Sequence, residues 1–453
     1  MADTINIGNY EVSCFKVGSS DCKIYLGDTL LYPHSTPTVK DYFRLIAKGD
    51  GYFTFFSTGA ASANTLSYSL DSGTTWNTLV NSGTTPYLDA GDAIMWKGSN
   101  LVVSNNGIGK FSASTRFDVE GNVMSLIYGD DFETATTITD VGQFRSLFDS
   151  STNVINASGL TLPATTISQD AYRSMFYGCS GLTTAPALPA TTLGESCYKY
   201  MFRDCKSLTT APALPATNLE QSCYANMFQG CTSLTGVPSN YLSATTVKQQ
   251  CYENMFSGCT SFASLPDLPS TKMEQSCYKG MFYGCTSLTS VPSNYLPATT
   301  METECYWAMF QLCTGITSAV SVLPATTLKQ GCYCNMFSRC TSLVTPPVIS
   351  ATTVASACCY NMFYSGTSLT TTTSYMLPAR TLLPDCYRQM FYYCSKVDKI
   401  TCLATSNINT KNSTNNWVKG VKSSGTFTRA NASVSWPSGN NGRPSSWTLV
   451  NYT

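Results

Sequence analysis

The chain contains very little histidine and very little charge. One histidine, His34, occurs in 453 residues, and charged residues make up 12% of the chain. Lys and Arg together number 27 and Asp and Glu also number 27, so the formal net charge is zero. A chain without excess positive charge is not expected to bind nucleic acid or an anionic membrane. Because histidine is a common general base and metal ligand, its scarcity argues against catalysis and against a zinc site.

Long apolar runs and catalytic motifs are missing as well. No segment approaches the roughly 20 apolar residues of a membrane span, and the N-terminal residues are polar, unlike a signal peptide. The sequence has no Cys-x-x-Cys pair, no nucleophile elbow and no glycine-rich phosphate loop. Asp130 and Asp131 are the nearest approach to paired catalytic acids, and adjacent carboxylates in a polar turn are usually only solvated. We therefore expect no enzyme activity, no cofactor, no metal, no membrane insertion and no signal peptide.

What the sequence does have is a repeat. A Met-Phe pair returns every 26 to 28 residues, and Leu147-Phe148 lies 28 residues before the first pair as a degenerate copy. The pairs begin at Met175, Met201, Met227, Met255, Met281, Met309, Met336, Met362 and Met390. Self-similarity at this period indicates a solenoid of stacked units that share one continuous core. The predicted core includes Met201, Phe202, Met227, Phe228, Met255, Phe256, Met281 and Phe282.

Within one repeat, the apolar residues are spaced as on a short helix. In the best-defined copy they are Cys197, Tyr198, Met201, Phe202 and Cys205. At about 100° per residue they fall within a sector of roughly 140°, which is one helix face. Thr192 followed by Glu195 fits the helix-capping pattern S/T-x-x-E/Q. The sequence predicts a short helix in each repeat, then a short strand that ends at a proline.

The chain contains 21 cysteines, and most of them fall at the two cysteine positions of the repeat. Equivalent positions stack from coil to coil, so we expect these thiols to be buried as small apolar side chains. Disulfide bonds between neighbouring coils are the alternative, because equivalent cysteines could come within bonding distance.

The repeat resembles the BspA-type leucine-rich repeats. Their general form is a helix ending in Ala-Phe or Met-Phe, then x-x-Cys-x-x-Leu and a short strand, and Cys223–Leu234 follows it closely. Ala171 and Gly366 each replace one of the two cysteines. The resemblance implies a curved parallel solenoid used for adhesion or display. We therefore expect an α+β protein in which residues 130–404 form about ten coils, each with one short strand and one short helix.

The flanking segments predict β structure. Alternation of apolar and polar residues over 37–129 is typical of an antiparallel β-sandwich. Within it, Ser69–Trp76 fits the Asp-box pattern S-x-D-x-G-x-T-W known from sialidases, which is a structural hairpin turn. Residues 405–453 lose the repeat and predict a small β cap whose tryptophans close the open last coil. Carbohydrate binding by those tryptophans is the alternative.

Residues 1–36 are expected to form a separate hairpin module. Two short apolar runs flank Gly27-Asp28, which is a turn sequence. The segment resembles the "K-I-Y-x-G-D-T-x-x-Y" segment of virion proteins from phages of gut bacteria, with an ordinary terminal hairpin as the alternative. The resemblance implies attachment to other virion proteins through Ile24, Tyr25, Leu26, Leu30 and Tyr32.

Exposed aromatic residues are expected beside the Met-Phe pairs and in the longer turns. Core positions hardly change from coil to coil, whereas these positions vary. Rows of such rings would suit weak, repeated contacts with a host glycan or protein, or packing between copies of the chain. The candidates are Tyr177, Tyr200, Tyr241, Tyr283, Tyr295, Trp307, Tyr364, Tyr392 and Tyr393.

Two functions fit these features. The first is a virion structural protein, resembling a head or tail fibre of the crAss-like phages of gut Bacteroidales, assembled in the host cytoplasm and displayed on the virion surface. By analogy with such fibres we expect a homo-oligomer, namely a trimer. The second is a bacterial cell-surface adhesin with the same repeats. The lack of a signal peptide and the N-terminal hairpin favour the first.

Overall fold

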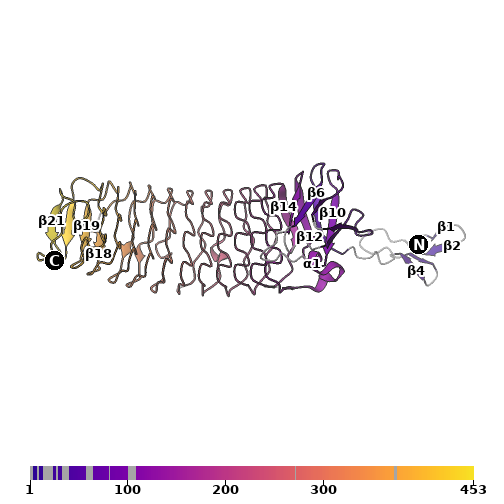
Figure 1. Ribbon diagram of the computed structural model, residues 1–453, viewed down its shortest axis with the longest axis horizontal. Coiled ribbons are helices and arrows are strands. Elements are labelled where there is room, and N and C mark those ends of the chain that lie inside the picture. The colour runs from indigo at the N-terminus through magenta and orange to yellow at the C-terminus, as the bar shows by residue number, and fades with distance from the viewer. Residues whose placement is uncertain are drawn as a thin grey trace.

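The computed structural model describes residues 4–7, 10–13, 24–26, 29–32, 40–57, 65–80, 82–99, 109–270, 272–371 and 375–453. The described chain is mostly short β-strands and turns. Within it, helix is limited to α1 (Ser125–Tyr128) and two 3-10 turns, η2 (Gly129–Thr134) and η3 (Ser239–Tyr241). Figure 1 shows the repeats side by side along one long axis, with the sheets of the first domain at one end and β21 at the other.

Two antiparallel strand pairs are found near the N-terminus. They are β1 (Thr4–Ile7) with β2 (Tyr10–Ser13), and β3 (Ile24–Leu26) with β4 (Thr29–Tyr32). The predicted attachment residues belong to β3 and β4, whereas the Gly27-Asp28 turn lies outside the described residues.

Two sheets follow the N-terminal pairs. Their strands are β5 (Phe43–Ala47), β6 (Phe53–Ser57), β7 (Thr65–Ser69), β8 (Asn77–Val80), β9 (Gly83–Thr84), β10 (Ala93–Gly98), β11 (Gly109–Ala113), β12 (Phe117–Asn122) and β14 (Val154–Thr161). One sheet has the order β14-β12-β5-β10-β7-β8, and the other has the order β11-β6-β9. Side chains alternate in and out along β5, so one face of the strand is buried. Phe43 of the first sheet lies 5.4 Å from Phe111 of the second, measured between ring centroids.

The larger sheet continues into the repeat region. Strand β14 comes from the first repeat and pairs in parallel with β12. Phe148 packs against Phe43 at 6.2 Å on one side and stacks on Phe176 of the next repeat at 5.2 Å on the other. The core between the two sheets described above, which contains Phe43 and Phe111, therefore covers the first coil. Without this cover the first coil would expose its apolar face.

Regular β pairing is sparse within the repeats. One short pair is formed by β13 (Thr137–Ile138) and β15 (Thr166–Ile167), and another by β16 (Val322–Leu323) and β17 (Val348–Ile349). Isolated parallel bridges join other coils, for example Gly236 with Ser264 and Ser290 with Ser318. All these pairings join neighbouring coils in the parallel sense.

The predicted helix of each repeat is wrong. The segment from 195 to 204 is a run of consecutive turns. The backbone enters the left-handed region at every fourth residue, with φ of 55° at Ser196, 60° at Tyr200 and 61° at Asp204. A right-handed α-helix contains no such residues.

Hydrogen bonding explains why turns replace the helix. Alternate N–H groups donate within the coil, as Met201 does to the carbonyl of Tyr198 at 3.1 Å. The others donate to the next coil, as Phe202 does to the carbonyl of Met227 at 2.9 Å. An α-helix would use its N–H groups internally and leave none to hold the coils together. The turn segment satisfies the backbone and joins the coils at once.

The apolar spacing fits this four-residue period better than a helix. Cys197, Tyr198, Met201, Phe202 and Cys205 are all buried, as the sequence pattern indicated. Counted from Cys197 as position 0, these residues stand at positions 0, 1, 4, 5 and 8. In a chain whose conformation repeats every four residues, these positions lie on one side. The same spacing drifts only slightly on a helix of 3.6 residues per turn, so the pattern alone could not separate the two.

Replacing Leu312 by glycine should stabilise the protein. Leu312 has φ of 63°, whereas glycine occupies the equivalent position of the two preceding coils, Gly258 and Gly284. A branched side chain costs roughly 1–2 kcal/mol in this region, and glycine loses about half of that gain through its freer unfolded chain. We expect Leu312→Gly to raise the free energy of unfolding by about 0.5–1 kcal/mol in urea titrations. Gln311→Gly, at a neighbouring position without positive φ, is the control and should lower it; a loss in both variants would contradict the account.

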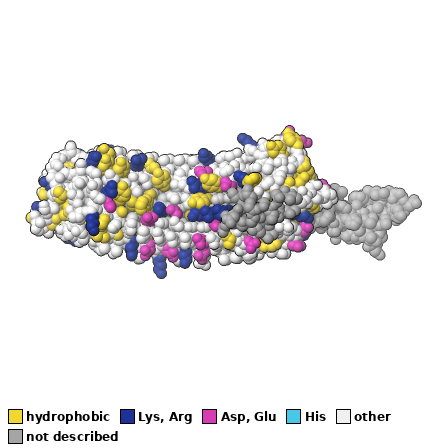
Figure 2. Space-filling view, viewed as in Figure 1, with side chains coloured by type: hydrophobic (Ala, Val, Ile, Leu, Met, Phe, Trp, Pro, Cys, Tyr) yellow, Lys and Arg dark blue, Asp and Glu magenta, His cyan; other side chains and the backbone are white. Residues whose placement is uncertain are grey.

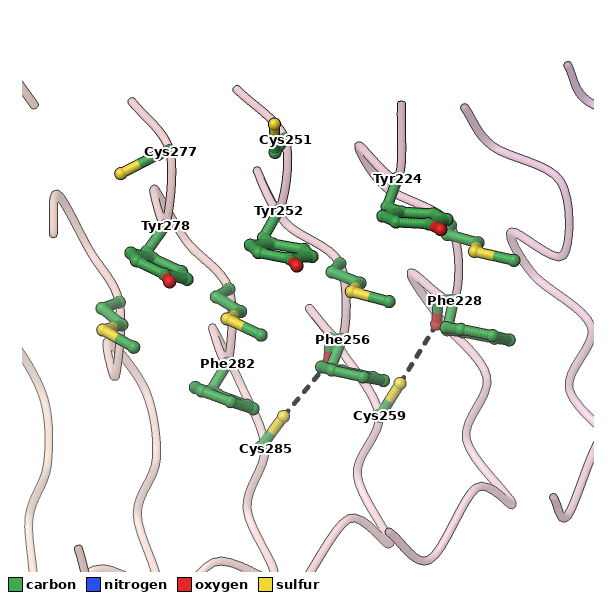
Figure 3. Packing of buried hydrophobic residues seen from close by; sticks show 14 of the residues in the cluster. Tyr224, Phe228, Cys251, Tyr252, Phe256, Cys259, Cys277, Tyr278, Phe282 and Cys285 are labelled. Carbon is green, nitrogen blue, oxygen red and sulfur yellow. Dashed lines mark hydrogen bonds between the residues drawn. The ribbon is translucent and has the colours of Figure 1, made fainter. Parts of the chain in front are cut away.

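Identical side chains of successive coils stack in columns (Figure 3). Ring centroids of Phe228 and Phe256 are 5.8 Å apart with planes 4° from parallel, and Tyr224 and Tyr252 are 6.1 Å apart at 5°. The following predicted core residues are fully buried: Met201, Phe202, Met227, Phe228, Met255, Phe256, Met281 and Phe282. Each coil thus presents the same shape to the next.

The cysteines belong to this core. Every cysteine from Cys179 to Cys402 is a buried free thiol, so the burial predicted for the repeat cysteines is confirmed. The second cysteine of a repeat donates to a phenylalanine carbonyl of the preceding coil, as Cys285 does to Phe256 at 3.1 Å (Figure 3). The small thiol fills the core and also satisfies a buried carbonyl.

The C-terminal segment extends the stack. Strands β18 (Tyr375–Leu377), β19 (Lys399–Cys402), β20 (Thr426–Arg429) and β21 (Thr448–Asn451) form one parallel sheet in that order. The turns between these strands are joined by polar groups: Asn416 N–H, between β19 and β20, donates to the side-chain oxygen of Asn441, between β20 and β21, at 2.8 Å. Trp417 stacks on Tyr387 and donates its indole N–H to a backbone carbonyl.

Candidate binding surface

Side chains beside the Met-Phe pairs form a partly exposed row, which is interrupted where the side chain is buried, as at Ala225, Ser257 and Ser338. We name this row the turn face; it consists of the residues one or two before and two or three after the Met of each pair. The four-residue period turns these positions outward while Met and Phe point inward. Hydrophobic and basic side chains gather in groups along the face of the rod shown in Figure 2.

The first cluster on the turn face combines two tyrosines with three cations. The guanidinium of Arg203 lies 5.5 Å from the ring centroids of both Tyr177 and Tyr200. Arg173 and Lys199 also lie over Tyr200, at 5.8 Å and 5.5 Å. Both tyrosines are half-buried, so one side of each ring is held by cation–π contacts and an edge stays open to solvent.

The middle of the turn face carries mixed charge. The Lys279 ammonium lies 5.1 Å from the Trp307 ring and 2.8 Å from a carboxylate oxygen of Glu304. Burial raises the pKa of nearby Glu253. Tyr283 is half-buried on the same face. The paired charges leave Trp307 as the main apolar feature here.

The second cluster is the most aromatic part of the turn face. Tyr364 and Tyr392 stack face to face, with centroids 5.0 Å apart and planes 5° from parallel, and Tyr393 meets Tyr392 edge-on at 4.4 Å. Lys419 lies 5.3 Å from the Tyr392 ring, and its hydrogen bond lowers the pKa of that phenol. Tyr393 is 48% exposed. Three rings and an ammonium group are thus presented together to solvent.

Two of the nine predicted surface residues are not on the surface. Tyr241 and Tyr295 are each only 7% exposed. Each hydroxyl donates to a proline carbonyl of the preceding coil at 2.8 Å, Pro212 for Tyr241 and Pro266 for Tyr295. The longer turns therefore fold inward over the core, because a tyrosine there can bury its ring and still satisfy its hydroxyl. The prediction of exposure at these two positions is wrong.

The cations of the turn face were missed from the sequence. Arg339 and Arg388 lie over Tyr364 and Tyr360, at 5.9 Å and 5.4 Å. A signal was present, because Lys or Arg stands two residues before or three after the Met in several repeats, as Lys279 and Arg339 do. The spacing that placed the aromatic rings outward places these cations beside them.

Asp130 and the Asp box, which the sequence analysis singled out, do not form an open site. Asp130 is held by the Tyr42 hydroxyl and by Lys97 at 2.9 Å, and these contacts lower its pKa. In the Asp box, the hydroxyl and N–H of Thr75 hold Asp71 and lower its pKa to about 2. Both carboxylates thus serve local structure.

The tryptophans of the C-terminal segment are buried. The exposed fractions are 0% for Trp417, 5% for Trp436 and 3% for Trp447. Trp417 and Trp436 stack on each other at 5.6 Å. They are therefore part of the core and are not available to bind carbohydrate.

Over the described residues, no group of three or more His, Cys, Asp or Glu side chains is arranged to hold a metal ion. The described part of the chain also contains no helix of the length and hydrophobicity needed to span a bilayer.

Comparisons with known proteins find a structural likeness only. No protein-family model and no curated protein matches the chain. A leucine-rich repeat protein from Bacteroides ovatus, known from a crystal structure, is similar with 14% sequence identity. The match covers 64% of this chain and 84% of that one, with a TM-score of 0.28. A likeness at this level does not assign a family or a function.

Proposed function

We propose that this protein is a non-enzymatic fibre protein on the head or tail of a phage particle. In this proposal residues 1–36 attach it to other virion proteins, and the repeats form about ten leucine-rich coils of the BspA type that project from the particle. The turn face then touches the host surface. The fibres would be homo-oligomers, with a trimer assigned by analogy.

The observation that carries the proposal is the turn face itself. It combines partly exposed aromatic rings with cations along an elongated stack, in two clusters around Tyr200 and Tyr392. Flat rings suit the C–H faces of sugars, and several weak sites on one rigid body reinforce each other. The uncharged, hydroxyl-rich remainder of the repeats gives a surface that resists non-specific association with charged partners.

Deleting residues 1–36 tests the attachment. Because every buried core residue of the part of the chain whose side chains are described lies at Tyr42 or later, the shortened chain should keep its fold and its melting temperature within about 2 °C, which corresponds to less than about 1 kcal/mol. Mass spectrometry of purified virions should detect the full chain and should not detect the shortened one. Equal incorporation of both chains would overturn the attachment role. Recovery of the full chain from the bacterial envelope and not from virions would support a cell-surface adhesin instead.

A further inference from the structure

A second row of the repeats, here named the strand face, ends in a basic pocket. The strand face consists of the residues that follow the second cysteine of each repeat. Near the C-terminal end it forms a cavity of about 550 Å³ lined by Lys396, Lys399, Lys422, Asp398, Thr371 and Ser395 among others. This volume falls in the range of small-molecule binding sites and would admit one or two sugar rings.

The pocket carries uncompensated positive charge. Lys422 Nζ pairs with Asp398 at 2.9 Å. Lys396 and Lys399 are exposed and have no acidic partner among the described residues. Three ammonium groups face one carboxylate in a chain whose total charge is zero. An anion entering the pocket would therefore meet two lysines that no carboxylate neutralises.

The pocket is built on a fixed backbone. The buried Thr371 hydroxyl accepts the N–H of Lys399 at 3.0 Å and that of Asp398 at 3.4 Å. Lys422 N–H donates to the carbonyl of Val397 at 3.2 Å. Hydrogen bonds across three successive coils thus hold the backbones of Lys399 and Lys422 in place, so binding a ligand would cost little backbone ordering there.

The surface that leads to the pocket is uncharged and rich in hydroxyl groups. Thr370 donates its hydroxyl to the carbonyl of Val344 at 3.2 Å, and Thr317 donates to Thr289 at 3.1 Å. With their protons used in this way, these hydroxyl oxygens can still accept hydrogen bonds from sugar hydroxyls. A nucleic acid would need several phosphate contacts along its length, and this stretch offers no cations for them.

We propose that this pocket binds an anionic sugar, carboxylated or sulfated, within a host-surface polysaccharide. The proposal rests on the adhesive function proposed above and assigns its ligand class. The anionic group lies between Lys396 and Lys399, and the neighbouring sugar rings lie along the threonines of the strand face. This site is separate from the aromatic clusters of the turn face.

The test measures binding of the full chain to polygalacturonate, to its fully methyl-esterified form, to heparin and to single-stranded DNA, by calorimetry at two salt concentrations. Lys396→Gln with Lys399→Gln should weaken binding of the favoured anionic glycan by about tenfold, which corresponds to about 1.4 kcal/mol, because both unneutralised ammonium groups are lost. Lys248→Gln with Lys329→Gln removes the same charge at exposed positions outside the strand face and should change affinity less than about twofold. The wild-type chain should bind the methyl ester at least about tenfold more weakly than the acid.

The outcomes separate the possibilities. Preference for polygalacturonate indicates a carboxylated sugar, and preference for heparin indicates a sulfated one. Equal losses in the two lysine variants, equal binding of DNA, or no binding of either anionic glycan would overturn the proposal. Trp307→Ser with Tyr364→Ser and Tyr392→Ser should leave the pocket's affinity intact. Virion incorporation is scored independently, so failure of the pocket and failure of the fibre role are distinguishable.

Discussion

The repeat region should unfold cooperatively when the pH is raised above about 9. Burial raises the pKa of the Cys259 thiol to about 12 from its ordinary value of 9.0. Burial likewise raises the pKa of the Tyr224, Tyr252 and Tyr278 phenols well above 10.0. The same environment recurs in every coil, so many groups respond together.

The direction of this pH effect follows from where the protons are held more tightly. In the folded state these groups keep their protons, whereas in the unfolded chain thiols ionise near pH 9 and phenols near pH 10. Their stabilising contribution is complete below about pH 9 and is lost as the pH rises towards the folded-state values. Each group that ionises only in the unfolded chain lowers the free energy of unfolding by about 1.4 kcal/mol per pH unit. About five such groups therefore lower it by about 7 kcal/mol over one pH unit, which is comparable with the stability of a typical domain.

Circular dichroism and tyrosinate absorbance, recorded together between pH 7 and 12, measure this transition. We expect both signals to change in one step. Tyr224→Phe is the matched control: its hydroxyl has no hydrogen-bond partner among the described residues, so its loss should be nearly neutral at pH 7 and stabilising at pH 10.5. Gradual formation of tyrosinate without loss of the fold would contradict the prediction.

Truncating Phe256 should produce the largest loss of stability at neutral pH. Its ring is fully buried, with Phe228 and Phe282 stacked at 5.8 Å on either side and Phe262 at 4.7 Å. Burying a phenylalanine in a core is worth about 3–5 kcal/mol relative to alanine. The ladder of hydrogen bonds between coils prevents the neighbours from closing the cavity. We therefore expect Phe256→Ala to lower the free energy of unfolding by about 5 kcal/mol, at the upper end of this range.

Equilibrium denaturation in urea gives the magnitude. Phe256→Leu keeps most of the volume and should cost less than about 1.5 kcal/mol. Tyr283→Ala, on the turn face of the next repeat, should change the free energy of unfolding by no more than about 0.5 kcal/mol. Because each coil contacts only its neighbours, the alanine variant is also expected to separate unfolding of the two halves of the stack. A loss below about 1 kcal/mol would show that the columns of rings do not carry the stability.

The repeat and its core could be predicted from the sequence because they are local and periodic. Met201 and Phe202 recur at fixed spacing, and any chain that stacks identical units must place its constant residues inside. The outward position of Tyr200 and Trp307 followed from the same spacing. These conclusions need only the period and the side-chain types.

The helix of each repeat and the exposure of Tyr241 could not be predicted in this way. The choice between a helix and a run of turns depends on where half of the backbone N–H groups find acceptors, and those acceptors belong to the next coil. A Ser, Asn, Asp or Gly at every fourth position, as at Ser196 and Asn226, was the available signal for the left-handed residues. For Tyr241, the acceptor is a proline carbonyl about one repeat earlier.

The sequence by itself determined the stacked repeat, the residues of its core and the lack of net charge, because these depend on spacing and composition. Only the tertiary structure decided the remaining features. It placed Arg203 against Tyr177 of the preceding coil, brought Lys422 to Lys396 and Lys399 of the preceding coil, and joined β14 of the first repeat to the sheet before it. The physical reason is that such contacts join residues about one repeat or more apart, and the register between neighbouring coils sets their distances.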